Sequence, residues 1–100
     1  MTTVHTLASG SSGNALVFSC GDVRLLVDAG ISCRRVEAGL RELGLADLTA
    51  VLITHTHTDH ISGLRTLLKR RNVPVYAAEA AGRDLALRLP EINGRLETLE

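Results

Sequence analysis

An apolar run that leads straight into a cluster of metal-ligand side chains constrains this chain more than any other feature. Residues 50–53 are all apolar, which is the pattern of a short strand buried on both faces. Thr54 follows, and the next six residues read His-Thr-His-Thr-Asp-His. Open α/β sheets place their ligand sites where the strands end at the carboxyl edge. The sequence therefore predicts an α/β fold with a functional site at that edge.

Four side chains of this cluster have the chemistry and spacing of metal ligands. His55, His57 and Asp59 alternate, so an extended or gently turning segment projects them to one side, and His60 follows as a helix begins. Imidazole and carboxylate groups are good ligands for zinc and neighbouring divalent metals. A lone histidine is by default a solvated or structural residue, but this density of ligands favours a metal site. Such a metal lowers the pKa of its bound water and generates a nucleophile.

Apolar periodicity and turn residues predict six strands and three helices around this site. Ser32 suits the N-cap of the first helix, Gly44 suits its C-terminal stop, and Pro90 ends the third helix. The residues Cys-Gly-Asp at 20–22 suit the turn of a hairpin. Strands are expected at residues 4–7, 15–19, 23–27, 50–53, 75–76 and 95–99, and helices at 32–43, 61–71 and 79–89.

Length and composition limit the domain count and the partners. The 100 residues allow one domain, and a hydrophobic content of 45% suffices for a core. Eleven basic residues balance eleven acidic ones, so a polyanion contact requires a local patch. Cys20 and Cys33 lack C-x-x-C spacing and are expected to be free, buried thiols. With no signal-peptide pattern and no membrane-spanning stretch, we expect a cytoplasmic protein without a membrane partner.

Three segments together resemble a known family. The residues at 55–60 match His-x-His-x-Asp-His, the signature of the metallo-β-lactamase fold superfamily. Leu-Leu-Val-Asp-Ala-Gly at 25–30 is similar to that superfamily's strand ending in an aspartate, and Val-Leu-Ile-Thr at 51–54 to the strand that feeds the metal loop. Residues 7–14 and 60–64 most resemble the WalJ/YycJ-type branch, single-domain proteins regarded as DNA exonucleases.

The resemblance implies a role for each residue of the cluster. His55 and His57 would belong to a first metal site, and Asp59, taken as catalytic, and His60 to a second, with two Zn²⁺ or Mn²⁺ ions per complete domain. Asp28 would be a buried carboxylate that holds ligands in orientation, or an ordinary turn cap; both interpretations stay open.

The implied activity is DNA hydrolysis by a metal-bound hydroxide, with DNA as the substrate partner. The alternatives are a glyoxalase-II-like thioester hydrolase, an RNA 3′-processing nuclease and a non-catalytic metal-binding fragment.

The resemblance also shows what these residues lack. Members of the superfamily complete their metal sites with two further histidines and a bridging aspartate, and the only other histidine here, His5, matches no ligand position. We expect residues 1–100 to form the N-terminal part of a single domain, which is half of an αββα sandwich with a mixed β-sheet and flanking helices. One sheet face would then be bare. The chain is expected to be a fragment, whose missing C-terminal half or a second chain covers that face.

Two further segments have both an ordinary and a functional interpretation. The loop that carries Ser11, Ser12 and Asn14 either contacts a substrate phosphate or simply connects two strands. It has neither a Walker A nor a nucleophile-elbow pattern. The basic residues Arg65, Lys69, Arg70 and Arg71 end the second helix, where cations suit the helix dipole, and nucleic-acid contact is the alternative.

Only one of two histidine substitutions should affect metal binding. We expect the chain to bind about one divalent ion weakly, His57→Ala to remove most of that binding and His5→Ala to leave it unchanged. Elemental analysis after gel filtration measures the bound metal. Equal losses in the two variants would show that the cluster is not the metal site.

Overall fold

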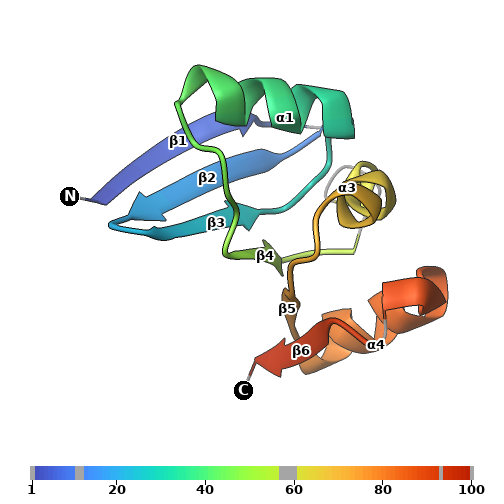
Figure 1. Cartoon of the computed structure of the whole chain (residues 1–100). Coiled ribbons are helices and arrows are strands. Elements are labelled where there is room, and N and C mark those ends of the chain that lie inside the picture. The colour runs from blue at the N-terminus through green and yellow to red at the C-terminus, as the bar shows by residue number, and fades with distance from the viewer. Residues whose placement is uncertain (1, 11–12, 57–60, 93, 100) are drawn as a thin grey trace.

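The computed structural model describes residues 2–10, 13–56, 61–92 and 94–99, which form one six-stranded sheet with helices packed against it (Figure 1). The strands lie in the sheet in the same order as in the chain. The elements are β1 (Thr2–Ala8), β2 (Ala15–Cys20), β3 (Val23–Val27), α1 (Cys33–Glu42), β4 (Ala50–Ile53), α3 (Leu64–Arg70), β5 (Val75–Ala78), α4 (Glu79–Arg88), the 3-10 turn η1 (Pro90–Ile92) and β6 (Leu96–Leu99).

The sheet is mixed, and its parallel half fixes where the candidate site lies. β1, β2 and β3 pair antiparallel, whereas β3, β4, β5 and β6 pair parallel. Val27, the last residue of β3, pairs with Leu52 of β4. Parallel neighbours end at the same edge of a sheet. The loops that follow β3 and β4 therefore begin side by side, which confirms the predicted α/β fold.

One face of the sheet supplies the core. The strand register aligns Val17, Leu26, Val51 and Val75 in one row across four strands, and all four side chains are fully buried. They join one cluster with apolar residues of the helices, including Leu40 of α1, and Figure 1 shows α1 and α3 on the same side of the sheet. Burial of each such side chain stabilises the fold by about 1.5–3 kcal/mol.

The opposite face is apolar but only partly covered by the described residues. Val27, Leu52 and Tyr76 align across it and are half-buried. Beside them lies a cavity of about 370 Å³ lined by Thr49 and by residues of β3, β4 and β5. Val4 and Val23 are 56% and 44% exposed. The prediction that β4 is buried on both faces was therefore wrong for Leu52, since helices pack only on the other face.

Most elements match their predicted positions, and the exceptions have local causes. β1 is longer than expected because it pairs with β2 along nearly its whole length. Cys33 is buried as expected, but Cys20 is exposed, because it ends β2 beside the hairpin turn, where Thr2 Oγ1 donates a hydrogen bond to its Sγ at 3.3 Å. Among the described residues, no helix is long and apolar enough to cross a membrane.

An ion pair joins the first helix to the end of α3. Arg71 donates two hydrogen bonds to the Glu37 carboxylate, at 2.9 Å and 2.7 Å, and a third to the carbonyl oxygen of Ala46 at 3.0 Å. The hydrogen bonds from Arg71 lower the pKa of Glu37. Both side chains are mostly buried, so water screens this pair less than a surface pair. Arg71 thus links α1 to the end of α3. The predicted helix-dipole role does not account for this ion pair.

Close backbone contacts hold the loop after β3 in place. A Cβ on Gly63 would lie 1.9 Å from the carbonyl oxygen of Ile31, and a Cβ on Gly13 would lie 2.6 Å from that of Gly30. Gly13 also has a φ of +138°, a conformation that L side chains rarely adopt. Only glycine fits at these two positions. The segments that contain Gly13 and Gly63 can therefore approach the loop after β3 closely.

Substitution of Gly63 should destabilise the fold for a steric reason. Its φ of −94° is ordinary, so Gly63→Ala adds only the clash with the Ile31 carbonyl. We expect a loss of about 2 kcal/mol or more in the free energy of unfolding, measured by urea denaturation. Gly94→Ala is the matched control, because nothing lies within 4 Å of a Cβ at Gly94. Equal stabilities of the two variants would contradict the close contact.

Candidate metal centre

Asp28 is placed at the carboxyl end of β3 by an unusual backbone conformation. Its φ is +65°, the left-handed region that aspartate and asparagine tolerate better than most residues. Its backbone N–H donates to the carbonyl oxygen of Leu52 at 2.8 Å, which extends the pairing of β3 and β4 by one residue. The side chain is 6% exposed. A buried carboxylate is costly unless it accepts hydrogen bonds, so its partners matter.

The partner of Asp28 is Thr54, the residue directly after β4. The Thr54 backbone N–H donates to Asp28 Oδ1 at 2.8 Å, and its hydroxyl donates to Oδ2 at 2.7 Å. Hydrogen bonds to a carboxylate are stronger than those between neutral groups. One side chain at the end of β3 therefore holds both the backbone and the side chain at the end of β4.

The same hydroxyl reaches the first residue of the cluster. Thr54 Oγ1 lies 3.1 Å from Nδ1 of His55. Because the hydroxyl proton is directed to Asp28, the oxygen accepts in this contact and the His55 ring donates from Nδ1. In a neutral ring this places the lone pair on Nε2, the form in which a histidine binds metal through that nitrogen. The chain from Asp28 through Thr54 to His55 thus orients a candidate ligand.

Two segments from elsewhere in the chain are tied to the loop after β3. Gly30 N–H donates to the carbonyl oxygen of Asn14, in the loop after β1, at 2.9 Å. Gly63 N–H donates to the carbonyl oxygen of Ala29 at 2.8 Å, and the Ser62 hydroxyl donates to that of Gly30 at 2.7 Å. The segment that follows the predicted metal loop is thereby anchored to the end of β3.

The structure describes only part of the predicted site. Of the predicted ligands it places His55, which is exposed; the remaining three, His57, Asp59 and His60, lie outside the described residues, as do Ser11 and Ser12. No group of three or more metal-ligand side chains occurs within residues 2–10, 13–56, 61–92 and 94–99.

The structure also places Asn14, a predicted substrate-contact residue, and His5, which was not expected to be a ligand. Asn14 hydrogen-bonds to Gly10 through both its side-chain oxygen and its side-chain nitrogen, at 3.3 Å and 3.1 Å, and so closes the loop after β1. His5 lies in β1, paired with Val17.

The donor set suits a divalent metal, and Asp28 has the surroundings of a residue that supports ligands. Its carboxylate is buried, hydrogen-bonded and linked through Thr54 to a histidine. Thr54 itself was missed as a functional residue in the sequence. The signal was present, since a hydroxyl residue stands between the strand and the first histidine.

Comparison with known proteins decides the family. The family model described as metallo-beta-lactamase superfamily matches residues 8–95. The chain belongs to the metallo-β-lactamase superfamily. Proteins of this superfamily generally bind divalent metal ions, which agrees with the predicted cluster.

The superfamily relatives differ in what their names say they act on. Exodeoxyribonuclease YycJ of Bacillus anthracis is 47% identical over 75 residues, which cover 73% of this chain and 28% of the relative. Hydroxyacylglutathione hydrolase of Alkalilimnicola ehrlichii is 51% identical over 51 residues, covering 51% of this chain and 19% of the relative. The solved Rm3 metallo-beta-lactamase is 30% identical with a TM-score of 0.70, covering 83% of this chain and 32% of that one. The chain thus spans about a third or less of each relative.

Removing the charge of Asp28 should weaken metal binding. In Asp28→Asn the amide can turn its NH₂ towards Thr54, so that the hydroxyl donates to Nδ1 of His55 and the ring proton moves to Nε2. We expect a 10- to 100-fold loss of zinc affinity, about the loss typical for partners of metal-ligating histidines. Isothermal titration calorimetry measures the affinity, with Asp22→Asn in the exposed β2–β3 turn as control. Unchanged affinity in Asp28→Asn would show that Asp28 does not orient a ligand.

Proposed function

We propose that the protein carrying this chain is a metal-dependent DNA phosphodiesterase that degrades DNA from an end. The observation that carries the proposal is the similarity to an exodeoxyribonuclease over 73% of the chain at 47% identity. The hydrogen-bonded chain of Asp28, Thr54 and His55 supports it, because it orients an imidazole at the edge of the sheet where the predicted metal loop begins.

Each residue of the cluster has a proposed part in this activity. His55 and His57 would hold one ion, and Asp59 and His60 a second, with Zn²⁺ or Mn²⁺ as the metals. When bound, such ions supply an activated water and offset charge on the phosphoryl oxygens. Asp28 and Thr54 keep the His55 ring in one orientation, so the ligand needs little rearrangement when the metal binds.

Thioester hydrolysis is the second candidate, and one comparison favours it. The hydroxyacylglutathione hydrolase of Alkalilimnicola ehrlichii is 51% identical, although over fewer residues than the exodeoxyribonuclease. Both candidates use the same metal cluster. Substrate assays therefore separate them, whereas metal analysis does not.

The decisive assay compares substrates on two forms of the protein. Labelled linear DNA, RNA and a thioester are incubated with the 100-residue chain and with the chain extended by any residues that its gene encodes beyond Glu100. We expect the 100-residue chain to show no turnover, because the four ligands of its cluster cannot close two metal sites. We expect the extended protein to release nucleotides from DNA ends when zinc or manganese is present and not when chelator is added.

Matched variants link any activity to the cluster. Asp59→Asn should lower the rate of DNA cleavage by more than about 100-fold, beyond the loss typical of residues that only support a ligand. Asp22→Asn should leave the rate unchanged. Thioester cleavage without DNA cleavage would assign the function to the second candidate. Chelator-sensitive cleavage by the 100-residue chain would contradict the claim that its four ligands cannot close two metal sites.

A further inference from the structure

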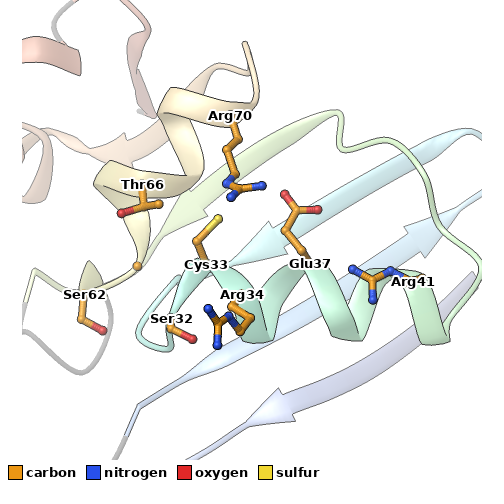
Figure 2. A pocket seen from close by; sticks show the side chains of 9 residues that line it. Ser32, Cys33, Arg34, Glu37, Arg41, Ser62, Thr66 and Arg70 are labelled. Atoms are coloured by element: carbon orange, nitrogen blue, oxygen red, sulfur yellow. The ribbon is translucent and has the colours of Figure 1, made fainter.

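A pocket of about 590 Å³ lies between α1 and α3 (Figure 2). Its volume is within the range of about 300–1,000 Å³ that is usual for ligand sites. Figure 2 shows Cys33 and Glu37 of α1 and Arg70 of α3 directed towards one another, and Arg34 and Arg41 at separate places along α1. The lining residues are Ser32, Cys33, Arg34, Glu37, Arg41, Ser62, Gly63, Thr66 and Arg70.

The pocket carries net positive charge. Arg34 and Arg41 come from α1 and Arg70 from α3, and within the described part of the chain none of the three forms an ion pair. Glu37 is the only acid among the described lining residues; Arg71 holds its carboxylate at both oxygens, and the charges of Arg70 and Arg41 also act on it. The described lining thus has three arginines and one glutamate, and its net charge stays positive.

Arg70 has a different environment from the neighbours with which the sequence grouped it. Arg71 is committed to Glu37, and Arg65 is paired with Glu91 at 2.7 Å. A helix-dipole role would account for Arg70 alone, but it does not account for Arg34 near the start of α1. Arginines from two helices thus line one pocket, and a helix-dipole role does not explain this arrangement.

One end of the pocket lies beside the loop that follows β3. Ser62, which follows His60 by two positions, lines the pocket and donates to the carbonyl oxygen of Gly30 in the loop after β3. From there the pocket runs along α1 from Arg34 to Arg41, about 10 Å at 1.5 Å per residue. Arg34 and Arg41 are therefore far enough apart to contact different phosphates of one DNA strand.

We propose that this α1–α3 pocket binds backbone phosphates of the DNA strand whose end is processed at the metal loop. The inference rests on the proposed function and adds the path of the substrate. The formal net charge of the chain is zero, so binding of a polyanion requires a local basic surface such as this one. Arginine suits the task because its planar fork matches phosphate oxygens.

The test measures DNA binding separately from turnover. Anisotropy of a labelled single-stranded oligothymidylate is followed with chelator present, for the wild-type chain and for Arg34→Gln/Arg41→Gln/Arg70→Gln. The control, Arg35→Gln/Arg83→Gln/Arg88→Gln, removes the same charge at positions outside the pocket. Arg34→Lys/Arg41→Lys/Arg70→Lys keeps the charge. Thermal melting confirms that each variant is folded.

We expect the pocket variant to bind at least 10-fold more weakly, and the control and lysine variants to stay within about 3-fold of wild type. The slope of log affinity against log salt should fall by about 2, since each phosphate contact on a single strand contributes about 0.7. If the wild-type chain binds the oligonucleotide and the pocket and control variants lose equal affinity, the α1–α3 pocket is not the DNA-binding site. The proposed function would not be affected by that result.

Two further arms separate the pocket from the proposed function. The assignment of DNA to the pocket is wrong if oligouridylate binds there and oligothymidylate does not. It is also wrong if polyglutamate binds there with the same affinity as oligothymidylate. If the extended protein cleaves only the thioester, the proposed function fails whatever the pocket binds.

Discussion

The hydrogen bonds between Asp28 and Thr54 are the interaction on which the rest of the site depends. They join the ends of two parallel strands at 2.7 Å and 2.8 Å, and the carboxylate that accepts them is buried. A buried carboxylate left without these donors would cost several kcal/mol, so the two loops are strongly coupled. The left-handed backbone at Asp28 aims its side chain across to β4, and the direction of the Thr54 hydroxyl then sets the orientation of the His55 ring.

This coupling needs close packing around the loop that follows β3. The loop after β1 approaches it at Gly13, and the segment after the predicted metal loop approaches it at Gly63; at both positions a side chain of any size would meet a backbone carbonyl. The core row of Val17, Leu26, Val51 and Val75 holds the strands in register behind them. A rigid sheet edge with close backbone contacts is a suitable base for a site whose ligands come from a loop.

Local patterns in the sequence predicted much of the fold. Ser32 caps α1 by accepting a hydrogen bond from the Arg35 backbone, as expected, and β4 covers the predicted residues. The apolar run alone predicted that β4 is buried on both faces, whereas Leu52 is only half-buried, because an apolar run does not reveal whether helices cover one face or both. The exposure of Cys20 depends on its place at the end of a hairpin. The predicted ligands His57, Asp59 and His60 lie outside the described residues and stay predictions.

Long-range contacts in the site were beyond sequence reasoning. Asp28 and Thr54 are 26 positions apart, and Arg71 and Glu37 are 34 apart, so only the folded chain shows that they meet. The same holds for the α1–α3 pocket, whose arginines come from two helices. The residue types in the sequence predicted a metal site and a basic helix end. Only the tertiary structure shows which residue pairs with each charged side chain.

The protonation of the His55 ring is the most direct test of the hydrogen-bonded chain. Long-range ¹H–¹⁵N correlation spectra of the ¹⁵N-labelled chain report which ring nitrogen carries the proton, and a zinc titration reports which nitrogen binds. We expect the proton on Nδ1 in the absence of metal and a zinc-dependent shift of Nε2. A proton on Nε2, or a His55 ring unaffected by zinc that the chain demonstrably binds, would contradict the role assigned to Asp28 and Thr54.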